Sequence, residues 1–304
     1  MKKVLFCAIA FLVLLVSPPI IRAQLTVDRI FGSAEFRAEA FTGARWQEDG
    51  ISYTRLERSA EGPELWVYDA ASGQRTRLVS TEQVTPDGWD TPLQIEDYFW
   101  SSDRSKLLVY TNSKRVWRRN TRGDYWVLDL EKGSLRKLGC DAEASTLMFA
   151  KFDPAGTRVG YVMKNNIYVE DISTGVITPL TTNGAEKLIN GTFDWVYEEE
   201  FGLRDGFRWS PDGKSIAYWQ LDASGIRDFL LINNTDSLYS FTIPIQYPKT
   251  GTTNSAARIG VGRSFQRQAS MPHRSGLCGK RAAVVSNYAQ KEGRPVHAGR
   301  SVLY

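Results

Sequence analysis

The fold is decided by residues 209–218, which read Trp-Ser-Pro-Asp-Gly-Lys-Ser-Ile-Ala-Tyr. An aromatic residue is joined to an apolar strand through Pro-Asp-Gly, and these three residues favour a tight turn. Proline presets φ, aspartate bonds its own backbone, and glycine accepts positive φ. Weaker copies of this motif begin at Trp46, Trp100 and Phe152, so that successive starting aromatics are 54, 52 and 57 residues apart. The chain therefore repeats a unit of about 50 residues.

A second motif follows the first in each of the first three units. A strand ends in aspartate, glycine follows four residues later, and leucine follows five residues after that. The copies are Asp69/Gly73/Leu78, Asp129/Gly133/Leu138 and Asp171/Gly175/Leu180. The flanking alternation of residue types predicts a hairpin with a short loop. Each unit then holds two hairpins, and four antiparallel strands in a repeated unit of this length are typical of a propeller blade.

We therefore expect an all-β fold, a β-propeller of four-stranded blades that is incomplete, with room for four to five blades between about residues 27 and 262. The spacing alone does not decide whether the ring closes. A β-sandwich with coincidental turns is the alternative. The composition agrees with strands, because 12% of the residues are aromatic, and 42% hydrophobic residues exclude a disordered chain.

The charge is unevenly distributed. Residues 263–304 carry eight Lys/Arg against one acid, a net charge of +7, which leaves −3 for the rest of a chain whose total is +4. A slightly acidic body has no electrostatic footprint for nucleic acid, so we expect no nucleic-acid partner. Both histidines, His273 and His297, lie in the same tail. The absence of histidine from the body excludes most familiar catalytic and zinc sites there.

The first residues have the order of a secretory signal peptide. Lys2 and Lys3 precede an apolar run, Val4–Val16, which is followed by Ser-Pro-Pro at 17–19 and by Ile-Arg-Ala-Gln at 21–24. This order predicts a signal peptide at 1–23, cleaved between Ala23 and Gln24, and hence a periplasmic or secreted protein. A membrane anchor is the alternative, but a helix of this length spans only about 20 Å of a bilayer core of roughly 30 Å.

Residues 194–201, Asp-Trp-Val-Tyr-Glu-Glu-Glu-Phe, interrupt the hairpin pattern. On a strand, neighbouring glutamates would point to opposite faces, whereas on a helical turn two of them can converge on one cation. Such a pair would hold an ammonium group or a divalent metal, and the alternative is a solvated acidic helix turn. No D-x-D-x-D-G spacing is present, so a calcium site is disfavoured, and we expect neither a metal nor a cofactor.

A basic segment precedes this run in the chain. Its cations are Lys114, Arg115, Arg118, Arg119 and Arg122, with Trp117 among them. Basic residues around an aromatic can bind nucleic acid, but five charges on one loop are more often a solvated surface. Because we expect the protein to be exported, we favour a solvated surface over a nucleic-acid site for this segment.

Together, Trp117-Arg118, residues 194–201, residues 209–213 and residues 246–251 (Gln-Tyr-Pro-Lys-Thr-Gly) resemble the N-terminal propeller of the dipeptidyl-peptidase IV family. This family belongs to the prolyl-oligopeptidase clan of serine peptidases. The resemblance covers about residues 26–261, and we place the propeller at 24–262.

The resemblance implies a function and a site. It implies an exported serine exopeptidase that removes N-terminal dipeptides with proline or alanine in second position, and a homodimer for the full-length protein. The last two glutamates of the acidic run, Glu199 and Glu200, are implied to hold the free α-ammonium of the peptide. The arginine of the Trp-Arg pair, Arg118, is implied to contact the substrate's backbone carbonyl.

The catalytic half of such an enzyme is not found in the chain. The family carries a C-terminal α/β-hydrolase domain with a G-x-S-x-G nucleophile elbow, then aspartate and histidine. No G-x-S-x-G occurs here, and the nearest match, residues 213–217, lacks the final glycine. We therefore expect no catalytic residue in this chain and no activity from it alone. Two classes stay open, the recognition part of a dipeptidyl-peptidase and a non-enzymatic exported propeller that acts as a binding module.

The tail at 263–304 departs from the family pattern. Its composition changes abruptly to Arg, Ser, Gln and His directly after Val261. Our hypothesis is a frameshift or a truncated gene model, and the alternative is a genuine basic tail. Sequencing the locus decides between them, because an intact continuation that encodes a hydrolase domain would support the frameshift.

Overall fold

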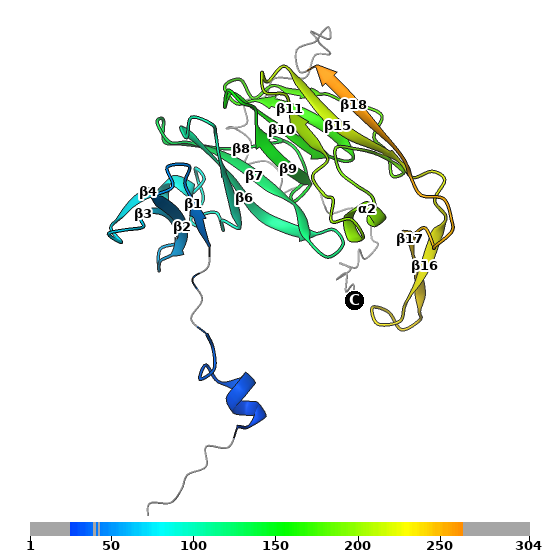
Figure 1. Ribbon diagram of the computed structural model, residues 1–304, viewed down its shortest axis with the longest axis horizontal. Coiled ribbons are helices and arrows are strands. Elements are labelled where there is room, and N and C mark those ends of the chain that lie inside the picture. The colour runs from blue at the N-terminus through cyan, green and yellow to red at the C-terminus, as the bar shows by residue number, and fades with distance from the viewer. Residues whose placement is uncertain (1–24, 39–40, 42, 264–304) are drawn as a thin grey trace, which may run out of the picture. The chain divides into compact units, whose positions relative to one another are not determined.

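The computed structural model describes residues 25–38, 41 and 43–263, and the chain divides after Ala44 into two compact units (Figure 1). The smaller unit contains a short π-helix at Asp28–Gly32, and Arg29 forms an exposed ion pair with Glu35. The predicted signal peptide and residues 264–304 of the predicted tail lie outside the described residues. Within the described ranges, no helix is long and apolar enough to cross a membrane.

The larger unit is built of antiparallel β-sheets, so the predicted all-β fold is confirmed. The first sheet contains β1 (Ala44–Trp46), β2 (Ser52–Arg58), β3 (Pro63–Asp69) and β4 (Arg75–Val79) in chain order. A 3₁₀-helix at Glu82–Val84 follows it. The next two groups of strands are β5 (Asp97–Trp100), β6 (Lys106–Arg115), β7 (Asn120–Asp129) and β8 (Ser134–Lys137), and then β9 (Leu147–Phe152), β10 (Arg158–Met163), β11 (Asn166–Asp171) and β12 (Ile177–Pro179). A bridge between Gly123 and Leu147 joins these two groups into one eight-stranded sheet.

The two sequence motifs lie where the repeat predicts. Three starting aromatics are the last residues of the first strand in their groups, Trp46 in β1, Trp100 in β5 and Phe152 in β9. The fourth, Trp209, is the last residue of β14 (Phe207–Trp209), the second strand of its group. The aspartates of the second motif end β3, β7 and β11. The glycine four residues later has a φ of 69°, 62° and 72° in the three copies, which is the left-handed conformation that the turn requires.

The core lies between neighbouring groups of strands. Leu107 and Val109 of β6 belong to one apolar cluster together with Leu65 of β3, whereas Leu108 belongs to another together with Val159 of β10. Since successive side chains of a strand point to opposite faces, β6 is covered on both faces. Burial on both faces explains why residues 107–110 are a continuous apolar run. Such a run is expected of a strand in a blade that packs between two neighbouring blades.

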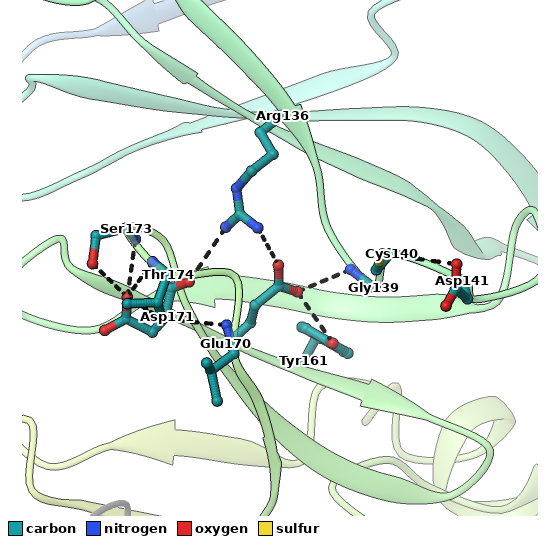
Figure 2. Close-up of polar contacts among 10 residues, drawn as sticks. Arg136, Gly139, Cys140, Asp141, Tyr161, Glu170, Asp171, Ser173 and Thr174 are labelled. Atoms are coloured by element: carbon teal, nitrogen blue, oxygen red, sulfur yellow. Dashed lines mark hydrogen bonds and ion pairs between the residues drawn. The ribbon is translucent and has the colours of Figure 1, made fainter. Parts of the chain in front are cut away.

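A buried carboxylate connects the second group of strands to the third (Figure 2). Glu170 of β11 has no exposed surface, and its Oε1 accepts from Arg136 Nη1 of β8 over 2.7 Å. Its Oε2 accepts from the Gly139 amide over 2.9 Å and from the Tyr161 hydroxyl over 3.3 Å. Such a buried charge is tolerated because both of its oxygens are hydrogen-bonded.

We expect Glu170 to make the stability of the fold depend on pH. Burial raises the pKa of Glu170, despite the opposing effects of Gly139 and Arg136. Between the ordinary and the raised pKa, the folded chain retains a proton that the unfolded chain has lost, so the free energy of unfolding falls as pH rises through that interval. The difference between wild type and Glu170→Gln should therefore shrink in denaturant titrations as pH rises above the ordinary pKa of a glutamate. A constant difference would contradict this, and the exposed Glu131→Gln is the control.

The fourth group of strands forms a sheet of its own, which we call the fourth sheet, and two short strands share one of its edges. β13 (Leu188–Asn190) and β14 both pair with β15 (Ser215–Asp222), and β18 (Ala256–Arg263) pairs with β15 along its whole length. Because a strand has only two edges, β13 and β14 follow one another along the same edge of β15. A hairpin of β16 (Asp228–Asn233) and β17 (Phe241–Gln246) is inserted between β15 and β18.

Residues 192–205 leave the fourth sheet between β13 and β14, and two glycines close the neck of this insertion. The Gly191 amide donates to the Trp219 carbonyl, the Trp219 amide donates to the Gly206 carbonyl, and the Gly206 amide donates to the Gly191 carbonyl, over 2.9, 2.9 and 3.0 Å. A Cβ on Gly206 would lie 2.9 Å from the carbonyl carbon of Gly191. The backbones approach so closely that the neck requires glycine at position 206.

Candidate functional site

The acidic run forms a short helix inside this insertion, α2 (Trp195–Glu199). Asp194 caps it, because its Oδ1 accepts from the Tyr197 amide over 3.1 Å. Val196 is buried on one side of the helix, and the Tyr197 ring stacks on Phe193 at 5.8 Å. The carboxylates therefore lie on a helical turn, in the conformation in which two of them can converge on a cation.

The three glutamates of the run have different environments. Glu198 is only 1% exposed, and its Oε1 lies 3.3 Å from Arg204 Nε, so it is part of the packing of the insertion. Burial raises the pKa of Glu198. Glu199 has a side chain that is 4% exposed, whereas Glu200 is exposed. Of the two glutamates that the family resemblance assigns, Glu200 is open to solvent, whereas the side chain of Glu199 is nearly as buried as that of Glu198, which is 2% exposed.

Glu199 and Arg118 are in direct contact. Arg118 Nε lies 2.6 Å from Glu199 Oε2, and the arginine side chain is 76% exposed. Glu199 Oε1 is buried and has no hydrogen-bond partner among the described residues. A carboxylate oxygen is an acceptor only, so this atom lacks a donor.

Arg118 reaches α2 from another sheet. It lies at the tip of the β6–β7 hairpin, which the Val116 amide closes by donating to the Arg119 carbonyl over 2.9 Å. Val116 packs on the apolar cluster that contains Phe207 of β14. The tip of the hairpin thus packs on an apolar cluster to which β9, β10, β11 and the fourth sheet all contribute, and Arg118, two residues after Val116, reaches Glu199 from there.

Glu200 borders a cavity of about 280 Å³. Its lining comes from α2 and from the segment after β17, and it includes Trp195, Tyr247, Lys249 and Asn254. The structure brings Arg118 and Glu199 together, while Glu200 faces this cavity. The convergence of both glutamates on one ammonium stays a prediction.

The other cations of the basic segment are exposed. Lys114, Arg115, Arg119 and Arg122 make no ion pair with any carboxylate in the described part of the chain. In the same ranges, no group of three or more His, Cys, Asp or Glu side chains could hold a metal ion. The chemistry that the structure shows at the site is that of one buried carboxylate, Glu199, next to one arginine, Arg118.

Two further contacts hold the insertion, and sequence analysis missed both. Lys151 Nζ of β9 donates to the Asp205 carboxylate and to the Phe207 carbonyl, the latter over 3.1 Å. Burial lowers the pKa of Lys151 to about 8. Asp194 Oδ2 accepts from Ser255 Oγ over 2.6 Å. No sequence motif indicates Lys151 or Ser255 as a partner of the insertion, because each is a single residue far from the acidic run in sequence.

Comparisons with known proteins agree on one family. The family model described as "Dipeptidyl peptidase IV (DPP IV) N-terminal region" matches residues 101–279, which include Arg118, Glu199 and Glu200. Dipeptidyl aminopeptidase B of Saccharomyces cerevisiae is 34% identical over 174 residues, which are 56% of this chain and 21% of that protein. Dipeptidyl peptidase 4 of Trichophyton tonsurans is 34% identical over 224 residues, 72% of this chain and 28% of that protein.

A solved structure gives the same result. The crystal structure of dipeptidyl peptidase 4 of Porphyromonas gingivalis superposes with a TM-score of 0.65 and 26% identity, covering 80% of this chain and 35% of that one. The chain thus spans about a quarter of the length of the curated relatives. The family match extends past Val261, where the resemblance was expected to end, and the boundaries of the propeller and of the tail stay predictions.

Proposed function

Because the chain belongs to the family of dipeptidyl peptidase IV N-terminal regions, we propose that it is the substrate-recognition propeller portion of an exported serine exopeptidase. In this proposal, Glu199 and Glu200 bind the free α-ammonium of a peptide, and Arg118 binds the backbone carbonyl that follows it. Recognition of the charged terminus lets the enzyme count two residues from it and release dipeptides with proline or alanine in second position.

The proposal depends mainly on Glu199 Oε1, which has no donor among the residues that the structure describes. A buried acceptor without a donor is costly, and an ammonium group supplies up to three N–H donors and the opposite charge. A neutral amide at the peptide terminus supplies neither the charge nor the number of donors. The site therefore favours a free amine over a blocked one.

Arg118 is placed to act on the same ligand. It approaches Glu199 through Nε, and a guanidinium has further N–H donors in the same plane. Its side chain is largely exposed, so an arriving ammonium can share the Glu199 carboxylate with it. The arginine then lies beside the bound terminus, where the first carbonyl of a peptide would be.

The test compares two peptides that differ only at the N-terminus. A peptide with proline in second position and a free amine should bind the full chain about tenfold or more tightly than its acetylated twin, since a charge-assisted hydrogen bond contributes about 1.5–3 kcal/mol. Titration calorimetry or competition fluorescence measures both affinities. A third peptide, dimethylated at the terminus, keeps the charge and separates it from the hydrogen bonds. Equal binding of the free and the acetylated peptide by folded protein would refute the role.

The whole enzyme's remaining properties are part of the same proposal. A C-terminal α/β-hydrolase domain would supply the Ser-Asp-His triad, so we expect no dipeptide release from this chain alone, and turnover would refute that expectation. The alternative, a non-enzymatic binding module, is tested by fusing such a hydrolase domain in frame to this chain. A binding module would keep its preference for the free amine in the fusion but would not release dipeptides.

Export and dimer formation complete the proposal. Export rests on the Val4–Val16 run and predicts a mature N-terminus near Gln24, which N-terminal sequencing checks. A homodimer is supported by the β16–β17 hairpin, which exposes Leu230, Ile232 and Leu238. Exposed apolar side chains grouped on one element suit a protein partner. Sedimentation of the full-length protein before and after Ile232→Lys measures it.

A further inference from the structure

We infer that Ser255 and Tyr247 are positioning residues for α2, which hold the start of this helix and so set the direction of the Glu199 carboxylate. Both belong to residues 247–255, which we call the clamp segment. The expected effect on ligand binding rests on the proposed function, whereas the effect on the stability of α2 does not.

The first contact of the clamp segment is with the helix cap. Asp194 uses its two carboxylate oxygens for different purposes, because Oδ1 accepts from the Tyr197 amide and Oδ2 accepts from Ser255 Oγ. The serine contact is 2.6 Å long, as expected of a hydroxyl that donates to a carboxylate, and Asp194 and Ser255 are 4% and 8% exposed. The cap of α2 is therefore tied to a residue 61 positions away in sequence.

Ser255 is itself well anchored. It directly precedes β18, whose first residue, Ala256, pairs with Asp222 of β15. The register continues without a shift to Arg263, which pairs with Ser215. Ser255 is thus held in place by β18, and its hydrogen bond in turn holds Asp194 and the first turn of α2.

The second contact is aromatic and involves the next residue of the helix. The Trp195 and Tyr247 ring centroids are 4.5 Å apart at an interplanar angle of 59°. Tyr247 directly follows β17, and its ring also contacts Phe229 of β16 at 5.8 Å. Two consecutive residues at the start of α2 are therefore held by the two ends of the clamp segment.

This arrangement bears on the glutamates because α2 is very short. A helix of five residues has little stability of its own, so its orientation comes from tertiary contacts. Trp195 and Glu199 are four residues apart and share a face of the helix. A rotation released at Asp194 and Trp195 would therefore carry the Glu199 carboxylate away from Arg118. The clamp segment also faces Glu200 across the cavity.

The experiment compares Ser255→Ala with Ser210→Ala in the full chain. Ser210 Oγ donates to Asp212 Oδ1 over the same 2.6 Å, but this bond lies in the exposed turn between β14 and β15. Hydrogen exchange of residues 195–200 should become about tenfold faster in Ser255→Ala and stay unchanged in Ser210→Ala. The preference for the free over the acetylated peptide should fall about fivefold in Ser255→Ala only. Ser255→Thr keeps the hydroxyl and should restore both.

The outcomes separate the two proposals. Unchanged exchange of residues 195–200 in Ser255→Ala would overturn the inference, whatever the peptides do. So would a variant with faster exchange that keeps the full amine preference of wild type, because Ser255 would then not position the glutamates. Faster exchange in a protein whose wild type shows no amine preference would refute the proposed function and leave the clamp itself established.

Discussion

Replacing Glu199 by glutamine should remove most of the preference for a free N-terminus. The substitution keeps the size of the side chain but removes its charge, and it turns one of the two acceptor oxygens into a donor that would face the ammonium. Since each lost charge-assisted hydrogen bond is worth about 1.5–3 kcal/mol, affinity for the free peptide should fall about tenfold or more. Affinity for the acetylated peptide should stay as it is. Isothermal titration of both peptides measures the ratio.

Two comparisons make this result specific. Glu131→Gln changes an exposed glutamate in the loop between β7 and β8, and it should leave the ratio unchanged. Glu200→Gln tests whether the second glutamate reaches the same ammonium, and an equal loss there would support convergence. A Glu199→Gln protein that unfolds at the wild-type temperature and retains its amine preference would contradict the assignment of Glu199.

Replacing Gly206 by alanine should strongly destabilise the fourth sheet. The added Cβ would meet Gly191 backbone atoms at 2.9 and 3.0 Å and the Thr192 amide at 3.1 Å, and none of these is the end of a flexible side chain. The two strands of the neck must separate, which weakens their hydrogen bonds to Trp219. We expect a loss of about 2–3 kcal/mol in the free energy of unfolding, measured by denaturant titration.

Gly225→Ala is the matched control for this loss. A Cβ at position 225 would have its nearest contact at 3.9 Å, an ordinary van der Waals distance, so the substitution should change stability by only a few tenths of a kcal/mol. Equal effects of the two substitutions would show that the neck is looser than its hydrogen bonds indicate.

The repeat could be predicted from sequence because each unit carries its own turn chemistry. Trp-Ser-Pro-Asp-Gly and Asp-x-x-x-Gly are local signals, and the structure places them at the ends of corresponding strands. The insertion between Gly191 and Gly206 could be predicted only as an interruption. Its neck depends on a contact between two backbones that are far apart in sequence, and no local pattern encodes such a contact.

The site shows the same division. A helical turn at residues 194–201 could be predicted, because adjacent carboxylates cannot share a ligand on a strand. The ion pair between Glu199 and Arg118 could not, because the resemblance assigned each of them to the ligand and not to the other. The different environments of Glu198 and Glu199 could not be predicted from identical side chains, since they follow from packing. The roles of Ser255 and Lys151 could not be predicted from sequence, because they depend on tertiary contacts alone.

The neck at Gly191 and Gly206 also separates the pairing of the strands from the contents of the insertion. β15 keeps its partners on both sides of the insertion, β13 on one side and β14 on the other, so the register of the sheet does not depend on what the loop contains. The contents of the insertion are nevertheless tied to the core, because Phe193 shares a buried apolar cluster with Ile189 of β13 and Leu221 of β15. A replacement loop between the two glycines would therefore have to supply an apolar side chain at that position.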